Sequence, residues 1–383
     1  MRIAHVVPTY FPAIRYGGPI LAVHALCKNL AARGHEVAVF TTNIDGRGVL
    51  GPEFTDVRMD GIDVHYFPVR QPRRLYYSPK MAEALESRIA RFDVLHLHSI
   101  FLYPTLKAAR CATRHRIPYV IAPRGMLVKE LIRKRNSFLK TAWISMFEKR
   151  TFEQAAAIHV TSALESEEIR QFGFAFPPIH EIPNGVEPPT ANSEEKRDPD
   201  TLLFLGRLDW KKGIERLISA MVELKGKRLI IAGNDEADYS RKLESLSVRL
   251  GVDARVDFVG PVAGEEKWRL YRRASVYILP SYSENLANTV LEAMAAECPV
   301  IVTPEVGLAE TVEKYGTGIV TAGEPASLAG AIRKIVENPK KARMMGRKGR
   351  SVVEERFSWG DIAATTEGMY YQLIDEQRDL ALA

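Results

Sequence analysis

The sequence predicts an α/β protein with two domains, each built on a parallel sheet covered by helices on both faces. Three observations support this fold class. Short β-branched runs alternate with amphipathic runs from residue 2 onward, the same alternation starts again at Thr201, and a polar, proline-rich stretch over residues 184–200 separates the two series. A chain of 383 residues is also too long for one ordinary core. We therefore expect an N-terminal domain over residues 1–190 and a C-terminal domain over residues 191–356.

The first half opens with a β-α-β unit. A strand over residues 2–7 leads through a loop into a helix that ends near Arg33, and a strand over residues 37–41 follows. The spacing of Leu21, Leu26 and Leu30 predicts the apolar face of that helix.

Two glycines, Gly17 and Gly18, precede this helix and would let the backbone approach a ligand closely. They do not form a G-x-G-x-x-G motif, and no acidic residue follows at the distance that a dinucleotide ribose requires. A nicotinamide cofactor is therefore disfavoured.

The rest of the first half continues the same alternation. Strands are expected near residues 62–67, 93–97, 118–121 and 156–160, and helices near residues 80–90, 104–114 and 162–171. His96 and His98 stand at the end of one strand, and Arg124 follows the next. Because no third ligand is obvious, we favour hydrogen bonding to a substrate or simple packing over a metal site for this histidine pair.

The second half repeats the architecture without visible sequence repetition. Strands are expected near residues 201–205, 227–232, 255–259, 276–279 and 299–302, with helices after residue 325. Four successive strands end in loops suited to a ligand. The first of these loops contains Gly206, Arg207 and Lys212, in which a guanidinium fork and a point charge suit two adjacent phosphates.

Residues 276–302 are predicted to form a strand, a polar loop, a helix and a second strand. A loop after the carboxyl end of a parallel strand is where doubly wound folds bind ligands. Glu284 lies in this loop and Glu292 inside the helix, so that their carboxylates approach one ligand from different directions. Asn288 and Thr289 fall at the first helical turn, whose free N–H groups favour an anion. The expected ligand is anionic at one end and rich in hydroxyls at the other.

Composition is typical of a soluble globular protein, with 46% hydrophobic and 26% charged residues. No apolar run approaches the roughly 18 residues of a membrane-spanning helix, and the N-terminus turns polar too soon for a signal peptide. Cys27, Cys111 and Cys298 are odd in number and far apart, which argues against a disulfide framework and against a zinc site. A reducing cytoplasm fits this pattern.

Positive charge is concentrated in residues 70–152, which hold 18 basic and 5 acidic residues. Such a stretch suggests contact with a membrane surface, a phosphorylated substrate or nucleic acid, and a solvated basic surface is the alternative. Within it, residues 127–153 interleave cations with apolar side chains. This segment is either a helix that lies on an anionic membrane surface or an ordinary surface helix docked on the sheet.

A series of ordered motifs resembles one family. The motifs are Gly206-Arg-Leu with Lys212-Gly213, Glu284-x7-Glu292, Arg33-Gly-His-Glu-Val37, His96-Leu-His98, Ile182-Pro-Asn-Gly-Val186 and Phe357-Ser-Trp359. Together they cover nearly the whole chain, which resembles the retaining, nucleotide-sugar-dependent glycosyltransferases of family 4 with the GT-B fold. The resemblance implies two Rossmann-like domains whose parallel sheets face each other across a cleft, the first binding the acceptor and the second the donor. It also implies that residues 357–383 form a helix that crosses back to the N-terminal domain.

The resemblance further implies roles for individual residues. Arg207 and Lys212 would hold the donor diphosphate and stabilise its growing negative charge, while Glu284 would face the donor sugar. These three residues are the expected catalytic set, and Glu292 would accept hydrogen bonds from the ribose. The other donor-binding residues that the resemblance implies are Gly17, Gly18, Gly206, Val259, Asn285, Leu286, Ala287, Asn288 and Thr289. Acceptor or sugar contacts are expected from His98 and Arg124.

Two departures from the family pattern bear on these roles. The family often has His where this chain has Arg124, which puts a histidine contact to the sugar in doubt. It often has Phe-Gly where this chain has Leu286-Ala287, and an alanine should restrict the loop while leaving its backbone donors in place.

The resemblance implies a hexosyltransferase that moves a sugar from a UDP- or GDP-sugar to a hydroxyl of a glycan or lipid-linked acceptor in cell-surface polysaccharide biosynthesis. It implies no metal, no other cofactor and no nucleic-acid partner. The expected location is the cytoplasm, with peripheral contact to the inner face of the plasma membrane through residues 127–153. Two alternatives stay open, a glycoside hydrolase with paired carboxylates and a non-enzymatic two-domain protein that binds a sugar or nucleotide.

Overall fold

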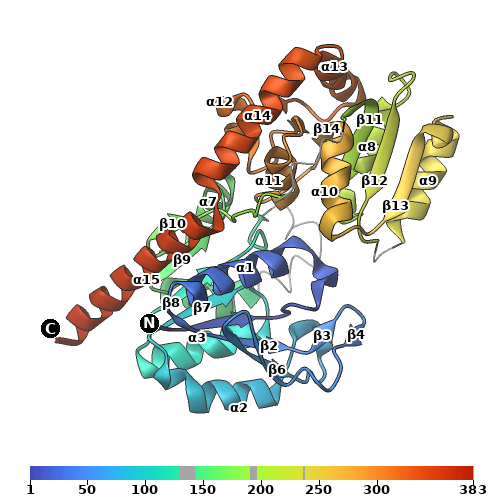
Figure 1. Cartoon of the computed structure of the whole chain (residues 1–383). Coiled ribbons are helices and arrows are strands. Elements are labelled where there is room, and N and C mark those ends of the chain that lie inside the picture. Colours follow the sequence, from blue (N-terminus) through green and yellow to red (C-terminus); the bar gives the residue numbers. More distant parts are fainter. Residues whose placement is uncertain (130–142, 190–195, 236–237, 383) are drawn as a thin grey trace. The chain divides into compact units, whose positions relative to one another are not determined.

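The computed structural model describes residues 1–129, 143–189, 196–235 and 238–382 (Figure 1). The chain divides into two compact units. Unit 1 consists of Met1–Pro183 with Trp359–Ala383, and unit 2 consists of Asn184–Ser358. The division falls between Pro183 and Asn184, whereas the boundary predicted from the sequence follows residue 190. The C-terminal residues return to the first unit, as the GT-B resemblance predicts.

Unit 1 is built on a sheet whose described strands run in the order β10-β9-β8-β7-β1-β2-β6-β5. The strands are β1 (Arg2–Val7), β2 (Glu36–Thr42), β5 (Asp56–Met59), β6 (Ile62–Phe67), β7 (Val94–His98), β8 (Tyr119–Ala122), β9 (Ala157–Val160) and β10 (Ile179–Glu181). Neighbouring strands are parallel except β5 and β6, so the prediction of a parallel sheet is wrong at this edge. The reason is local: Asp60 and Gly61 both have positive φ, at 49° and 79°, and form a two-residue turn that can join only antiparallel strands. A short hairpin of β3 (Ile44–Asp45) and β4 (Gly48–Val49) stands apart from this sheet.

Helices cover both faces of this sheet. Helices α1 (Gly18–Ala32) and α15 (Trp359–Leu382) pack on one face, and α2 (Pro79–Arg88) and α3 (Tyr103–His115) pack on the other. Strand β1 serves both layers, because Ile3 and Val7 join the core under α1 and α15 whereas Ala4 and Val6 join the core under α2 and α3. The strands are therefore nearly continuous apolar runs, as a sheet covered on both faces requires.

One predicted core residue of α1 lies on its surface. Leu26 and Leu30 are buried as predicted, but Leu21 is 44% exposed. Five residues along a helix advance about 500°, so Leu21 lies about 140° from Leu26 around the axis.

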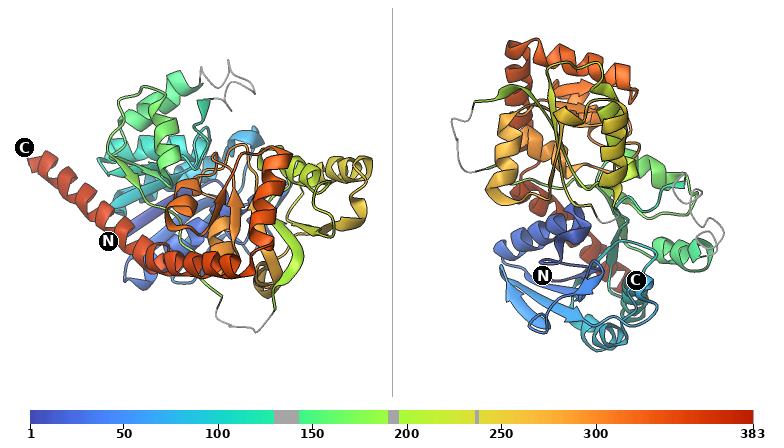
Figure 2. Two further views of the ribbon diagram at one scale, coloured as in Figure 1. Left: turned by 90° about the horizontal axis from the view of Figure 1, so that it is seen from above. Right: turned by 90° about the vertical axis from the view of Figure 1, so that its right-hand side faces the viewer.

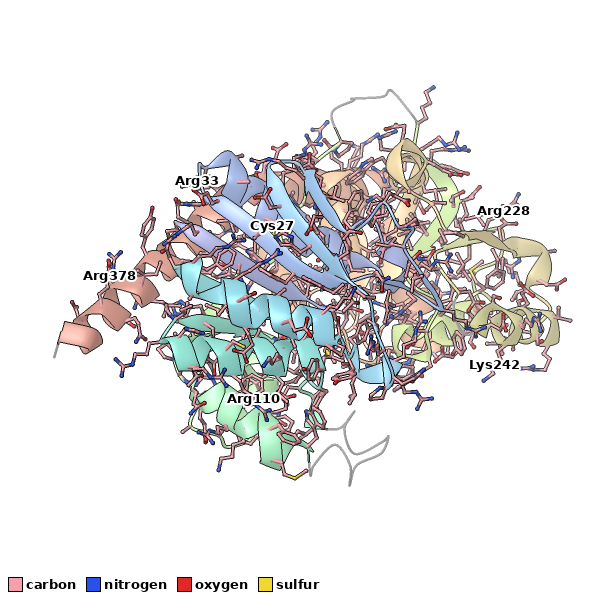
Figure 3. The ribbon with its side chains drawn as sticks, turned by 90° about the horizontal axis from the view of Figure 1, so that it is seen from below. Cys27, Arg33, Arg110, Arg228, Lys242 and Arg378 are labelled. Carbon is pink, nitrogen blue, oxygen red and sulfur yellow. The ribbon has the colours of Figure 1, made fainter. Side chains whose placement is uncertain are left out.

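Helix α15 is tied to unit 1 by polar contacts as well as by its apolar face. Arg33, at the end of α1 and labelled in Figure 3, forms an ion pair with Glu367 of α15. The same carboxylate accepts a hydrogen bond from Nε2 of His35 at 2.7 Å. These contacts explain why the last residues of the chain belong to the first unit.

Unit 2 holds a fully parallel sheet whose described strands run in the order β13-β12-β11-β14-β15-β16. The strands are β11 (Asp198–Leu205), β12 (Arg228–Ala232), β13 (Val256–Gly260), β14 (Ala274–Leu279), β15 (Val300–Val302) and β16 (Gly318–Val320). The helices are α8 (Ile214–Ala220), α9 (Tyr239–Arg249), α10 (Gly264–Arg273), α11 (Asn288–Ala295), α12 (Ala309–Tyr315), α13 (Pro325–Val336) and α14 (Pro339–Arg356). They cover both faces of the sheet (Figure 2). Renumbered within the unit, the strand order is 3-2-1-4-5-6, the order of the Rossmann fold.

The basic segment 127–153 is described only in part, because residues 130–142 lie outside the described residues. The prediction of a membrane-surface helix falls mostly on that stretch. The following residues form a π-helical turn (Ile144–Glu148) and α6 (Lys149–Glu153), with Ile144 and Phe152 buried in the unit 1 core. Among the described helices, none has both the length and the apolar character needed to cross a membrane.

Candidate functional site

The candidate site lies where the order of unit 2's strands reverses. Strands β11 and β14 are neighbours, and the chain leaves them toward opposite edges of the sheet. In open α/β sheets such a switch point forms a crevice at the carboxyl ends of the strands. The two loops that follow these strands, residues 206–213 and 280–287, carry the predicted catalytic residues.

These two loops are in direct contact. The backbone N–H of Tyr282 donates to the carbonyl of Lys211 at 2.7 Å. Gly213 has a φ of 62°, and a Cβ atom there would lie 2.1 Å from the carbonyl oxygen of Pro280. Only glycine therefore allows this close approach, which explains its place in the motif.

Lys212 and Glu284 form an ion pair between the loops. Their side chains are 16% and 20% exposed, so the pair is shielded but still reachable. Glu284 is also fixed through its backbone, since its N–H donates to Glu305 O at 3.0 Å and its carbonyl accepts from Gly307 N at 2.9 Å. Both groups keep hydrogen-bonding capacity for a ligand, because an ammonium has three N–H groups and a carboxylate about four acceptor sites.

Arg207 adds an exposed cation after β11. Backbone bonds on both sides fix the loop: Gly206 N donates to Ala232 O at 3.0 Å and Leu208 N donates to Asn234 O at 2.8 Å. Gly233 makes the first contact possible, because a Cβ atom there would lie 1.8 Å from Gly206 O. The Arg207 guanidinium has no ion-pair partner within the ranges that the structure describes, and it is open to an anion.

Helix α11 begins at Asn288, where the sequence predicts its first turn. The preceding residue, Ala287, has a φ of 74°, in the left-handed region, although it is not a glycine. The Tyr277 hydroxyl lies 3.0 Å from Leu205 O and 2.7 Å from the Thr289 hydroxyl. Since the carbonyl can only accept, Tyr277 donates to it and Thr289 donates to Tyr277. The start of α11 is thus held against the end of β11.

Glu292 is held by two residues that were not predicted from the sequence. Lys267 Nζ lies 2.7 Å from Oε1 of Glu292, and the hydroxyl of Tyr271 lies 3.0 Å from Oε2. Both residues belong to α10, which no motif singled out. Lys267 and Tyr271 are four residues apart, a spacing that places two side chains on the same face of a helix. This spacing was the signal in the sequence that could have identified them as a pair.

The other predicted donor residues take the following places. Val259, near the end of β13, is 47% exposed, while Leu286 and Ala287 are 4% and 5% exposed. Gly17 and Gly18 belong to unit 1, where Gly17 has a φ of 87° and Gly18 begins α1. Their closing over the diphosphate stays a prediction.

Unit 1 has a switch point of its own, between β1 and β7, and buried histidines gather beside it. Arg124 Nη2 lies 3.2 Å from Nδ1 of His98, so the two predicted acceptor residues do come together. Because arginine can only donate, His98 carries its proton on Nε2 and donates to Nδ1 of His5 at 2.9 Å. The remaining His5 proton is then on Nε2, a buried atom without a hydrogen-bond partner among the described residues.

A second chain of hydrogen bonds runs beside the first. His159 Nε2 lies 2.7 Å from the carbonyl of Ile182 and must donate to it. His159 Nδ1 therefore accepts from Nε2 of His96 at 3.1 Å, and His96 Nδ1 accepts from the Tyr370 hydroxyl at 2.6 Å. This chain connects α15, β7 and β9 through neutral imidazoles.

Burial keeps these histidines uncharged. Burial, and next the nearby Arg124 guanidinium, lower the pKa of His5 to about 3 and that of His159 to about 3. Burial also lowers the pKa of His96 and His98 well below the usual 6.5. Their side chains therefore act as hydrogen-bonding groups at neutral pH.

His5 supplies a third histidine that was not predicted from the sequence to join this pair. One ring nitrogen of each of His5, His96 and His98 lies within 4.8 Å of the others. A metal needs an unprotonated ring nitrogen, yet His98 Nε2 carries a proton and His96 Nδ1 already accepts from Tyr370. The adjacent Arg124 charge also opposes a cation, so the geometry favours hydrogen bonding over metal binding.

Comparisons with known proteins agree with this architecture. The family model described as Glycosyl transferase 4-like domain matches residues 17–185, and the model described as Glycosyl transferases group 1 matches residues 189–352. An uncharacterised glycosyltransferase of Methanocaldococcus jannaschii is 31% identical over 395 residues, spanning 97% of this chain and 98% of the relative.

Solved structures show the same fold. Sucrose-phosphate synthase from Thermosynechococcus elongatus superposes with a TM-score of 0.81 at 24% identity, covering 98% of this chain and 100% of that one. Anabaena HepE, solved in complex with UDP and glucose, superposes with a TM-score of 0.75 at 20% identity, covering 97% and 100%. The chain therefore belongs to the family 4 type of glycosyltransferases with the GT-B fold.

Proposed function

We propose that this glycosyltransferase is a retaining, metal-independent hexosyltransferase that moves a sugar from a nucleoside diphosphate sugar to a hydroxyl of a glycan or lipid-linked acceptor. The observation that carries the proposal is the Lys212–Glu284 pair at the switch point of unit 2, with the exposed Arg207 on the same loop. Cations suit a diphosphate, and a carboxylate suits sugar hydroxyls.

The proposed reaction uses the cations for charge stabilisation. The bond between the sugar's anomeric carbon and the β-phosphate oxygen breaks, and the same carbon forms a bond to the acceptor oxygen on the same face. The acceptor proton passes to the leaving phosphate. Arg207 and Lys212 stabilise the charge that grows on the diphosphate, Glu284 orients the sugar, and Glu292 accepts hydrogen bonds from the ribose.

The remaining predicted contacts belong to the same proposal. The backbone of residues 285–289 meets the sugar and phosphate, Val259 lies against the base, and Gly17 and Gly18 close over the diphosphate. His98 and Arg124 contact the acceptor or the sugar. The complex of Anabaena HepE with UDP and glucose makes a UDP-sugar the first donor to test.

The decisive experiment is a thermal-shift screen of UDP, GDP, ADP and their sugars, because a ligand that binds only the native state raises the melting temperature. The donor that binds is then incubated with candidate acceptors while release of nucleoside diphosphate is measured. Acceptor-dependent release supports the transferase. Binding without release under any acceptor supports a binding protein, and cleavage of an oligosaccharide without nucleotide supports a hydrolase.

We further propose that the enzyme works in surface-polysaccharide biosynthesis in the cytoplasm, in contact with the inner face of the plasma membrane through residues 127–153. The excess of cations in residues 70–152 supports this contact. Flotation with vesicles of anionic lipid should show binding that fades as salt rises. Failure to bind at low salt would contradict it.

A further inference from the structure

The carboxylate of Glu292 is fixed by two donors on one face of α10. Lys267 Nζ lies 2.7 Å from its Oε1 and the Tyr271 hydroxyl 3.0 Å from its Oε2. The side chains of Lys267 and Glu292 are 19% and 17% exposed, and Tyr271 is fully buried. Each carboxylate oxygen thus has one donor from the protein and keeps further acceptor capacity toward a ligand.

The two donors are themselves held in place. The Tyr271 ring lies 6.0 Å from the Trp268 ring and 5.6 Å from the Tyr277 ring, between centroids. Lys267 Nζ lies 4.8 Å from the centroid of the Trp268 ring, within the range of a cation–π contact. A carboxylate held by such groups has little freedom to rotate, and a fixed acceptor binds a fixed pair of hydroxyls better than a mobile one.

The charge of Lys267 has a second consequence. An unpaired Glu292 carboxylate would repel a ligand that carries a diphosphate. The ammonium at 2.7 Å offsets this repulsion and leaves the carboxylate oxygens with acceptor capacity for a ligand. The pair therefore presents acceptor oxygens without presenting net negative charge.

We infer that Lys267 and Tyr271 are positioning residues that make Glu292 a selector for ribose, so that the donor site distinguishes a ribonucleotide from its 2′-deoxy counterpart. The inference rests on the proposed donor site. It specifies that the ribose is the part of the ligand that is selected, and that Lys267 and Tyr271 enforce the selection. The loss of a hydrogen bond between a ligand and a charged group commonly weakens binding by about tenfold to hundredfold.

A purely structural role is the competing interpretation, because the Lys267–Glu292 pair also connects α10 to α11. The two roles differ in what they change. A structural role affects stability and lowers affinity for both nucleotides equally, whereas a positioning role changes the ratio of their dissociation constants.

The experiment measures dissociation constants by calorimetry for UDP, GDP and ADP and for their 2′-deoxy forms. For whichever diphosphate binds, the wild-type chain should prefer the ribonucleotide by at least about tenfold. Lys267→Met should reduce this preference to less than about threefold and Lys267→Arg should restore most of it. Arg269→Met, which removes an exposed cation from the same helix, is the matched control and should leave the preference unchanged.

The outcomes separate this inference from the proposed function. If a diphosphate binds and Lys267→Met keeps the wild-type preference, or if Arg269→Met lowers it equally, the positioning role is wrong while the donor site stands. Binding of none of the three diphosphates overturns the donor site and this inference together. Because Lys267→Met can lower stability, its melting temperature is measured, and Tyr271→Phe provides a second variant that removes only a hydroxyl.

Discussion

Lys212 and Glu284 form an ion pair between two loops that are far apart in the sequence and adjacent at the switch point of the unit 2 sheet. Neither residue alone identifies a site, because a lysine before a helix and a glutamate in a loop are both common. Their pairing at the carboxyl edge of a parallel sheet is what makes a cation and an acceptor available to one ligand.

The first prediction concerns this lysine. Lys212→Ala should lower the transfer rate by about a hundredfold to a thousandfold, since in the proposed mechanism it removes a cation that stabilises the leaving diphosphate. It should lower the free energy of unfolding by only about 1–3 kcal/mol, because Glu284 stays partly solvated. Steady-state kinetics and a melting curve measure both effects. Lys225→Ala, at an exposed lysine of the same unit, is the control, and an equal loss of rate in both variants would contradict the donor site.

A second prediction concerns the loop before α11. Ala287 has a φ of 74°, a conformation that disfavours an L-residue with a Cβ atom by about 1–2 kcal/mol. Ala287→Gly should remove this strain. Part of the gain is offset, because glycine has a larger backbone entropy in the unfolded chain, so the net stabilisation should be about 0.5–1 kcal/mol. The melting temperature measures it. Ala326→Gly, on the exposed first turn of α13, should have the opposite sign.

Much of the fold could be predicted because its signals are local. The strand Arg2–Val7 and the start of α11 at Asn288 follow from apolar runs and from the polar residues that interrupt them. The edge strand β5 was not among the strands expected from the sequence, although Asp60-Gly61 is a sequence signal for the hairpin that makes it antiparallel to β6. Leu21 was predicted on the apolar face of α1 but is exposed, because its angular position around the helix axis differs from that of the buried leucines.

Site residues could be predicted where they stand together in one sequence motif. Residues that reach the site from another helix or strand were missed. Glu292 stands in the motif, but Lys267 and Tyr271, which hold it, lie on another helix. His5 is a single histidine in an apolar strand, and only the pairing of β1 with β7 brings it to His98. Such contacts depend on sheet order, which the sequence does not state.

The buried histidines predict how stability depends on pH. In the unfolded chain His5 and His159 titrate near their usual pKa of 6.5, whereas burial lowers each pKa to about 3 in the folded unit. Between these values the unfolded chain binds more protons, so stability is full above about pH 6.5 and is lost as the pH falls toward 3. Each histidine contributes a slope of about 1.4 kcal/mol per pH unit.

Melting curves between pH 8 and pH 5 test this dependence. His5→Gln keeps an acceptor for the His98 N–H and removes one titrating group, so its melting temperature should fall less steeply with acid than that of the wild-type chain. His115→Gln, at an exposed histidine, should follow the wild-type curve. Identical slopes in all three proteins would show that the buried histidines do not control acid stability.

The last prediction concerns the contact between α15 and the histidines. The Tyr370 hydroxyl donates to Nδ1 of His96 at 2.6 Å, and both groups are buried. Tyr370→Phe keeps the ring and leaves a buried ring nitrogen without its donor, which should lower the free energy of unfolding by about 1–3 kcal/mol. Tyr371→Phe, one residue further along α15 and 49% exposed, makes the same chemical change at the surface and should be nearly neutral. Chemical denaturation of the two variants measures the difference, and equal stability would mean that the hydrogen bond between Tyr370 and His96 does not help to hold α15.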